Sequence, residues 1–317
     1  MAITARKYII VIQGPTASGK TSLSISLAEK LDTYFPTEIL SADSRQLYKF
    51  MDIGTAKPTI AERGAIPHHF IDMLTPDEPY SAGKFKRDAT DVANKLLERN
   101  ITPLVVGGTG LYVSALCEGM FEDETTDYTE IRSQLQNQLE ANGIESLYRE
   151  LQRVDKTSAD VYADKNPRRV LRALEYYLTH GEALSVAHKR ETSAQEFTPL
   201  YFAIDIERDV LYKRINKRSE NMWKNGLVDE TQRLLELGYS PELNALNTVG
   251  YKEALQYIAG EISFERGIEL TAQNTRRYAK RQLTWLRNRG INYIWLRGSQ
   301  DEMQEQVMQS LREHHLL

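Results

Sequence analysis

The sequence has a single cysteine, Cys117, and no apolar stretch that approaches the ~20 residues needed to cross a bilayer. One cysteine excludes an internal disulfide and a zinc site built from several cysteines, and we expect it to be a small buried apolar residue. The apolar run from Tyr8 to Ile12 is too short for a signal peptide, so we expect a cytoplasmic protein. The net charge of −4 gives no global attraction to nucleic acid, so any RNA site must come from local basic clusters.

With 41% hydrophobic and 26% charged residues, the composition is that of an ordinary globular protein. Short apolar runs alternate with helical patterns in the first third of the chain, which predicts a parallel sheet covered by helices. Strands are expected at 7–13, 38–43, 69–73, 103–106, 200–206 and 292–296, and helices at 20–31, 88–99, 130–142, 144–154, 167–180, 184–189, 208–224, 229–237, 251–259 and 265–289, followed by a short polar helix.

These elements predict an α/β fold: a P-loop parallel-sheet core with helices on both faces, a helical insertion domain and a helical C-terminal region. The expected boundaries place the first part of the core at residues 1–122, the insertion at 123–199, and the completion of the core with the C-terminal helices at 200–317. No repeat or flexible linker interrupts this order.

The clearest motif follows the first expected strand and opens the helix after it. It matches the pattern GxxxxGK[ST] with the residues Gly14, Pro15, Thr16, Ala17, Ser18, Gly19, Lys20 and Thr21. Glycines let the backbone N–H groups curl around a diphosphate at the positive end of the helix. Lys20 adds a positive charge, and the Thr21 hydroxyl is placed to bind Mg²⁺. Because most such loops hold ATP or GTP, a kinase or NTPase is the first expectation from this motif alone.

Three further segments change that expectation: residues 41–48 (SADSRQLY), 52–58 (DIGTAKP) and 106–112 (VGGTGLY). The ends of parallel strands lie at one edge of the sheet, so Gly14, Asp43 and Thr109 should meet in one crevice. His68 and His69 have no acidic or cysteine partner at ligand spacing, so we expect hydrogen-bonded structural histidines.

These segments together resemble the tRNA dimethylallyltransferase family, and the resemblance covers nearly the whole chain. It includes the glycine loop, the three segments above, Arg168–Arg172, Val249–Tyr251 and Lys280–Arg287. Eukaryotic members often carry a C-terminal zinc finger, which this sequence lacks, so it is most similar to the bacterial form. The family's function is transfer of a dimethylallyl group from dimethylallyl diphosphate to N6 of a flipped-out adenosine just 3′ of the tRNA anticodon.

The resemblance implies that the loop grips the diphosphate, with Mg²⁺ as the cofactor, and that Lys20 and Arg218 contact the leaving group. Arg218 could instead be a solvated helix charge. Asp43 matches the family's general base, although an aspartate at a strand end could also bind Mg²⁺. Thr109 would orient N6 or the diphosphate, or its glycine-rich segment could be only a tight turn.

Basic clusters supply the expected tRNA surface. The segment 275–290 has five arginines, one lysine and no acidic residue. Pro167 begins a second helix with a basic patch, although such a stripe is often only a solvated helix face. The residues expected to contact the anticodon stem-loop are Asp43, Ser44, Arg45, Gln46, Thr109, Arg132, Arg168, Arg169, Val170, Leu171, Arg172, Lys280, Arg281, Gln282, Leu283, Thr284, Trp285, Leu286 and Arg287.

Two other functions remain open from the sequence. An adenylate isopentenyltransferase would share the core chemistry without needing an insertion that carries arginines. A small-molecule P-loop kinase would use Asp43 as its base and consume ATP. We expect tRNA and dimethylallyl diphosphate as partners, no membrane association, and a monomer, since one chain is chemically sufficient for one tRNA.

Overall fold

The computed structural model describes residues 7–120, 128–189 and 196–317. The chain divides into two compact units, one formed by Met1–Glu118 with Gln195–Leu317 and the other by Gly119–Ala194. None of the described helices is long and apolar enough to span a membrane.

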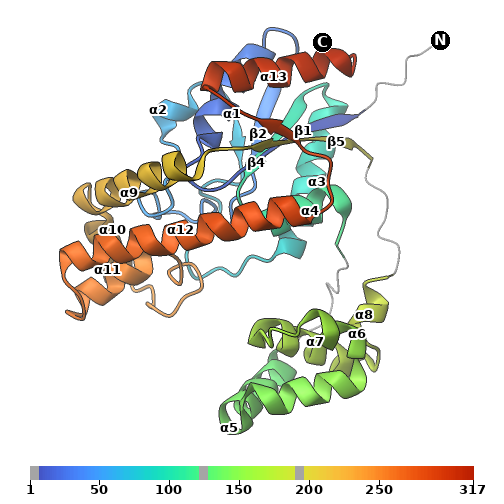
Figure 1. Cartoon of the computed structure of the whole chain (residues 1–317), viewed down its shortest axis with the longest axis vertical. Helices are drawn as coiled ribbons and strands as arrows, with labels where there is room; N and C mark the ends of the chain where they lie inside the picture. The colour runs from blue at the N-terminus through green and yellow to red at the C-terminus, as the bar shows by residue number, and fades with distance from the viewer. Residues whose placement is uncertain (1–6, 121–127, 190–195) are drawn as a thin grey trace. The chain divides into compact units, whose positions relative to one another are not determined.

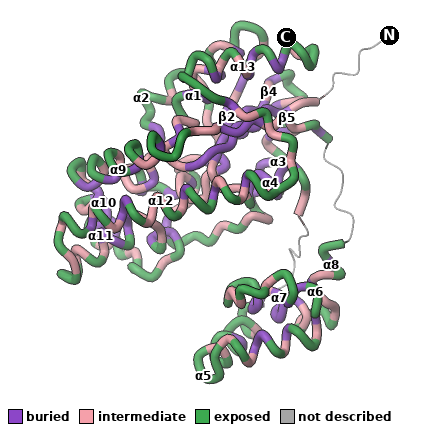
Figure 2. Tube along the Cα trace, viewed as in Figure 1, coloured by how far each residue is buried: buried purple, intermediate pink, exposed green. Residues whose placement is uncertain are grey.

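The larger unit is built on a six-stranded sheet in the order β3-β2-β4-β1-β5-β6, in which every pair of neighbours is parallel (Figure 1). This confirms the predicted α/β fold. The strands are β1 (Tyr8–Gln13), β2 (Thr37–Ser41), β3 (His68–His69), β4 (Thr102–Gly107), β5 (Thr198–Ile204) and β6 (Ile294–Leu296). Figure 2 shows that the buried residues concentrate along the central strands, as expected when helices cover both faces of a parallel sheet.

Successive residues of β1 point to opposite faces of the sheet. Ile9 and Val11 point to a core that contains Phe85 of α3 (Ala82–Glu98) and residues of α4 (Gly110–Glu118). Ile10 and Ile12 point to the other core, which contains Leu27 of α1 (Lys20–Leu31) and residues of α13 (Gln300–Glu313). Because side chains alternate along a strand and those of β1 are apolar on both sides, both faces of the sheet are covered by helices.

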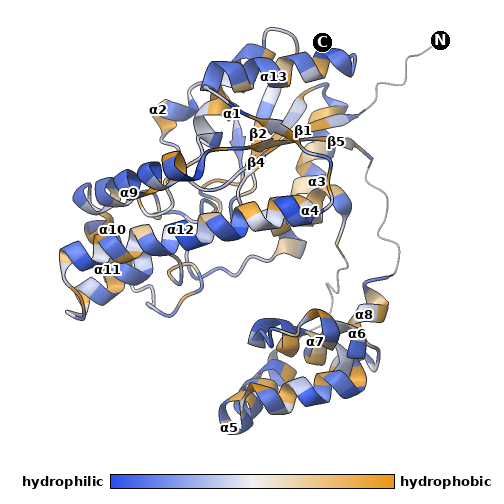
Figure 3. Cartoon of the chain, in the orientation of Figure 1, coloured by the Kyte–Doolittle hydropathy of each residue, from blue (hydrophilic) through white to orange (hydrophobic). Residues whose placement is uncertain are grey.

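Helices dominate the rest of this unit, and Figure 3 shows hydrophilic and hydrophobic patches alternating along them. They are α2 (Ile60–Arg63), α9 (Arg208–Lys224), α10 (Leu227–Glu236), α11 (Tyr251–Ile258) and α12 (Phe264–Asn288). The longest, α12, packs against α9, and Trp223 of α9 lies so close to Gly267 that a Cβ there would stand 2.0 Å from the indole. Only a glycine permits this approach.

A buried carboxylate on α10 holds the segment 52–54 in place. Glu230 accepts hydrogen bonds from the backbone N–H groups of Asp52 (2.9 Å), Ile53 (2.8 Å) and Gly54 (3.1 Å), and also from the Tyr251 hydroxyl. Four donors compensate the cost of burying this carboxylate. The segment then continues into Thr55 and Ala56, which line the cavity described below.

The smaller unit is helical, with α5 (Thr129–Val154), α6 (Lys156–Val161), α7 (Pro167–His180) and α8 (Leu184–Ala187). Leucines such as Leu135, Leu151 and Leu174 form its own core. The two helices predicted at 130–142 and 144–154 are confirmed, because α5 is divided at Gly143, whose φ of 70° is not helical.

Some predicted element ends differ from the structure. The second strand was expected to reach Asp43, but β2 ends at Ser41 and a turn begins at Ser44, which leaves Asp43 in the loop after the strand. The helix predicted from residue 88 begins at Ala82, where the Ser81 side chain accepts a hydrogen bond from the Lys84 N–H and caps it.

Candidate active site

The loop between β1 and α1, residues 14–19, carries the glycine motif and is called the phosphate loop below. It presents the N-terminus of a 12-residue helix. Gly19 is the N-cap residue, with a φ of 97° that favours glycine, and Ala17 also has a positive φ of 63°. The Lys20 ammonium donates to the Pro15 carbonyl at 2.7 Å, so the side chain folds back over the loop. N–H groups at the end of a helix together with a lysine form a site that attracts a phosphate group.

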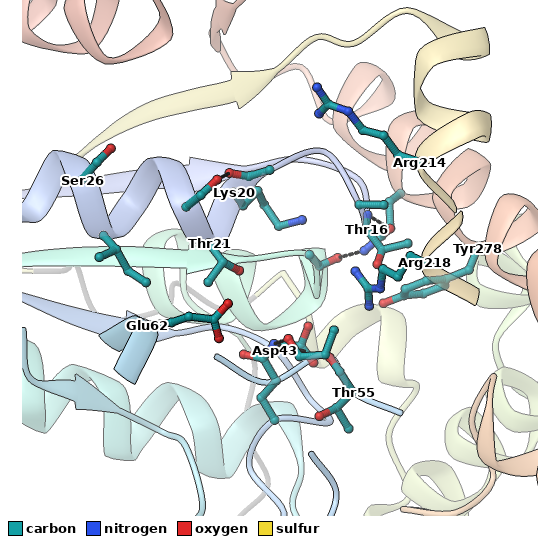
Figure 4. A pocket seen from close by; sticks show the side chains of 18 of the residues that line it. Thr16, Lys20, Thr21, Ser26, Asp43, Thr55, Glu62, Arg214, Arg218 and Tyr278 are labelled. Carbon is teal, nitrogen blue, oxygen red and sulfur yellow. Dashed lines mark hydrogen bonds between the residues drawn. The ribbon is translucent and has the colours of Figure 1, made fainter. Parts of the chain in front are cut away.

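This loop borders a cavity of about 630 Å³ (Figure 4). The cavity is lined by Lys20 and Thr21 together with Asp43 and Arg218, which come from other parts of the sequence. Figure 4 shows Asp43 across the cavity from the loop. The remaining lining residues are Thr16, Ala17, Gly19, Ser22, Ile25, Ser26, Glu29, Gln46, Thr55, Ala56, Glu62, Gly108, Arg214, Tyr278 and Gln282.

Burial disfavours the charged forms of two cations in this cavity, Lys20 and Arg218. Burial lowers the pKa of Lys20 to about 8. The nearby Asp43 carboxylate partly offsets this lowering, and the positive charge of Arg218 adds to it. Burial also lowers the pKa of Arg218, again against the attraction of Asp43. A bound anion with several negative charges would relieve both effects, since each cation gains a partner.

Asp43 is positioned by a close approach of two strand ends. The Ala42 N–H donates to the Val106 carbonyl at 2.7 Å, and a Cβ on Gly107 would lie 2.1 Å from the Ala42 oxygen. A glycine at 107 is therefore required. The Arg45 N–H donates to Oδ1 of Asp43 at 2.9 Å, which orients the carboxylate.

Thr109 contacts the loop that carries Asp43 and does not itself line the cavity. Its Oγ1 accepts the Ser44 N–H at 3.1 Å, and its own N–H donates to the Ala42 carbonyl at 3.2 Å. In this arrangement Thr109 ties the glycine-rich turn to the loop that carries Asp43.

Arg214 and Tyr278 are among the cavity residues that the sequence did not predict. Arg214 precedes Arg218 by one helical turn and donates to the Ser18 carbonyl at 3.3 Å. The i, i+4 spacing of these arginines in the predicted helix 208–224 was the available signal. Tyr278 lines the cavity near Asp43, and burial raises its pKa to about 12.

The predicted tRNA residues on α12 occupy different environments. Lys280, Arg281, Thr284 and Arg287 are exposed, whereas Leu283 and Trp285 are partly buried. Gln282 and Leu286 are only 8% and 4% exposed, because they face the phosphate loop and the core. The expectation of RNA contacts through these two side chains is therefore corrected.

The predicted tRNA residues of the smaller unit also include both exposed and buried side chains. Arg168 is exposed, Arg169 lies near Asp164, and the Arg172 guanidinium covers the Tyr128 ring at 4.5 Å. Arg132 makes a bidentate ion pair with the buried Glu175. Val170 and Leu171 belong to the core of the unit, so their side chains are not available to RNA, which corrects the expectation for them.

The residues predicted to be structural are confirmed as such. Cys117 is buried, and burial raises the pKa of its thiol to about 12, far from a reactive range. His68 contacts the Ile66 carbonyl and His69 contacts Glu38. Within residues 7–120, 128–189 and 196–317, no group of three or more His, Cys, Asp or Glu side chains is arranged to hold a metal.

Comparisons with known proteins identify the family of this chain. A sequence model described as IPP transferase matches residues 46–289. The tRNA dimethylallyltransferase of Natranaerobius thermophilus is 43% identical over 93% of this chain and 87% of its own. That of Pelotomaculum thermopropionicum is 44% identical over 89% of this chain and 88% of its own.

Solved structures extend the match to three dimensions. The tRNA delta(2)-isopentenylpyrophosphate transferase of Staphylococcus epidermidis has a TM-score of 0.69 and 38% identity, covering 98% of this chain and 100% of its own. A eukaryotic dimethylallyltransferase acting on tRNA has a TM-score of 0.76 and 28% identity, covering 92% of this chain and 73% of its own. The chain therefore belongs to the IPP transferase family, the tRNA dimethylallyltransferases.

Proposed function

We propose that this chain transfers the dimethylallyl group of dimethylallyl diphosphate to N6 of the adenosine just 3′ of the tRNA anticodon. The observation that carries the proposal is the cavity that joins the phosphate loop to Asp43. A base can reach such a cavity only when it is extruded from its stack. The adenine would enter on the side of Asp43, and the donor would bind on the side of the phosphate loop.

The cations of the cavity suit the leaving group. As the C1–O bond of the donor breaks, negative charge accumulates on the diphosphate, and Lys20, Arg214, Arg218 and the loop N–H groups stabilise it. The donor carbon C1 develops positive charge and forms its new bond to N6 of the adenine. Inorganic diphosphate leaves.

Asp43 is the proposed general base. The lone pair of N6 is delocalised into the adenine ring, so N6 becomes acidic only as the new C–N bond forms, and a neighbouring carboxylate then takes its proton. The hydrogen bond from the Arg45 N–H to Oδ1 fixes the direction of the carboxylate. Thr109 acts through the same loop by holding Ser44.

Magnesium is proposed as the cofactor, and the donor set of the cavity suits it. The exposed Thr21 hydroxyl lines the cavity beside Lys20. Mg²⁺ prefers few protein ligands, together with waters and phosphate oxygens, so this hydroxyl and the diphosphate suffice in place of an all-protein cage. When bound, the ion would neutralise part of the charge on the diphosphate.

The proposal predicts that ATP is neither needed nor consumed. An anticodon stem-loop RNA, dimethylallyl diphosphate and Mg²⁺ should together release inorganic diphosphate without ATP, and AMP should not replace the RNA. Nucleotides can compete for the loop through their phosphates. Phosphate release from ATP that RNA stimulates, without alkylation of the RNA, would favour a kinase or NTPase instead.

A second prediction concerns the exposed cations of α12. Replacing Arg281 and Arg287 together by Ala should raise the KM for tRNA on the order of tenfold at about 0.1 M salt and flatten its salt dependence by about two phosphate contacts. The KM for dimethylallyl diphosphate should not change. Arg266→Ala, at an exposed arginine near the start of the same helix, is the matched control and should leave both constants unaltered. An effect confined to the donor would refute the assignment of this surface to RNA.

A third prediction follows from the lowered pKa of Lys20. Below its pKa of about 8 the side chain is charged and attracts the diphosphate; above it the free enzyme must first gain a proton. Affinity for dimethylallyl diphosphate, measured calorimetrically without RNA, should therefore fall by up to about tenfold per pH unit above pH 8. Lys20→Met should bind weakly and show no such decline; an equal decline in this variant would assign the titration to another group.

A further inference from the structure

The buried edge of α12 contacts the proposed donor site. Gln282 is only 8% exposed and lines the cavity, although its neighbours Arg281 and Thr284 are exposed. The helix thus presents cations on one side and a buried amide on the other, as its 3.6-residue period allows.

The Gln282 side chain joins two loops that lie far from it in the sequence. Its Oε1 accepts the Thr16 N–H of the phosphate loop at 2.8 Å, and its Nε2 donates to the Gly108 carbonyl at 2.8 Å. Both ends of one amide are therefore used. A glutamine suits this place because it carries an acceptor and a donor in a fixed plane.

Two glycines make room for this edge of the helix. A Cβ on Gly108 would lie 2.3 Å from Nε2 of Gln282, and a Cβ on Gly110 would lie 2.2 Å from Nε1 of Trp285. The turn between them carries Thr109, which interacts with the Tyr278 hydroxyl. Residues at 278, 282 and 285 thus hold the glycine-rich turn from one side of α12.

We propose that Gln282 is a positioning residue that fixes the phosphate loop against the Gly108–Gly110 turn, rather than a residue that contacts RNA. The Thr16 N–H then maintains the shape of the loop instead of binding the diphosphate. Holding both loops before the donor arrives lowers the entropy cost of binding it. This inference rests on the proposed function, because it assumes that the loop binds a diphosphate.

The test measures binding of inorganic diphosphate without RNA, and binding of tRNA without donor. Gln282→Leu removes both hydrogen bonds and should weaken diphosphate binding about tenfold, the usual effect of losing one or two such bonds. It should raise the KM for dimethylallyl diphosphate and leave the affinity for tRNA unchanged. The matched control is Gln273→Leu, at an exposed glutamine of the same helix, for which neither affinity should change.

Two further variants keep the test decisive if Gln282→Leu fails to fold. Gly108→Ala displaces the same amide from the opposite side and should reproduce the loss of diphosphate affinity. Gln282→Glu retains an acceptor for Thr16 but brings a negative charge to the Gly108 carbonyl and to the diphosphate, so its loss should exceed that of Gln282→Leu. A loss of diphosphate affinity in every one of these variants supports the proposal.

The inference is overturned if tRNA affinity falls while diphosphate affinity is kept, since Gln282 would then contact RNA. It is also overturned if diphosphate binds equally well or more tightly to the variant, which would show that Gln282 competes for the Thr16 N–H. Failure of the wild-type protein to bind diphosphate would instead count against the proposed function itself.

Discussion

Asp43→Asn should slow alkylation of tRNA by about 10²–10⁴-fold, the usual range for loss of a general base. Asn retains an oxygen that can accept the Arg45 N–H, so the loop should keep its shape while the basic site is lost. The affinity for dimethylallyl diphosphate should change little, because the phosphate loop and its cations hold that ligand. Single-turnover rates at saturating tRNA measure the effect on the chemical step directly.

A magnesium-binding role for Asp43 gives a different result. The variant would then need more Mg²⁺, and excess metal would restore much of the rate. The same single-turnover experiment across a range of Mg²⁺ concentrations separates the two roles. Rescue by metal, or a loss smaller than about tenfold, would refute the assignment of Asp43 as the base.

Lys20→Ala should have the second large effect, a fall of about 10²–10³-fold in the rate of transfer, as for loss of one donor to a developing anion. It should also weaken the binding of dimethylallyl diphosphate, which Asp43→Asn should not. The reason is that, in the proposed complex, Lys20 would face the diphosphate both before and after the C1–O bond breaks. Binding of the donor without RNA and single-turnover transfer measure the two effects separately.

Lys30→Ala is the matched control for this variant. Lys30 lies on the same helix but pairs with Glu305 at the surface, at 3.1 Å, so its loss should leave both measurements unchanged. Lys20→Arg retains the charge in a different shape and should recover part of the binding. Full donor affinity in Lys20→Ala would show that the loop N–H groups alone bind the diphosphate.

Several elements could be predicted from the sequence because their signals are local. The helix α7 begins and ends where predicted, since Asn166 caps it, Pro167 occupies its first turn and Gly181 ends it with a φ of 67°. The buried run of β1 and the glycine loop after it also identify themselves without knowledge of the fold. The convergence of Lys20 in the glycine loop with Asp43 followed from the rule that parallel strands end at one edge.

Other features depend on contacts between distant residues, which no local pattern shows. The hydrogen bonds from 52–54 to Glu230 span 176 to 178 positions, and the Thr16–Gln282 bond spans 266. The period of α12 predicted a cationic stripe, but it could not show that Tyr278 and Gln282 face the cavity. For the same reason, Leu286 and Val170 were placed on an RNA surface although both are buried.

The central claim is that one cavity brings a prenyl diphosphate and a tRNA adenine together. Nucleoside analysis of the product tests it most directly. After incubation with dimethylallyl diphosphate, tRNA and Mg²⁺ in the absence of ATP, the RNA is digested and its nucleosides and fragments are identified by mass spectrometry. The account predicts a dimethylallyl group on N6 of the adenosine just 3′ of the anticodon and on no other base. Unmodified RNA, or a prenyl group at another atom or position, would contradict it.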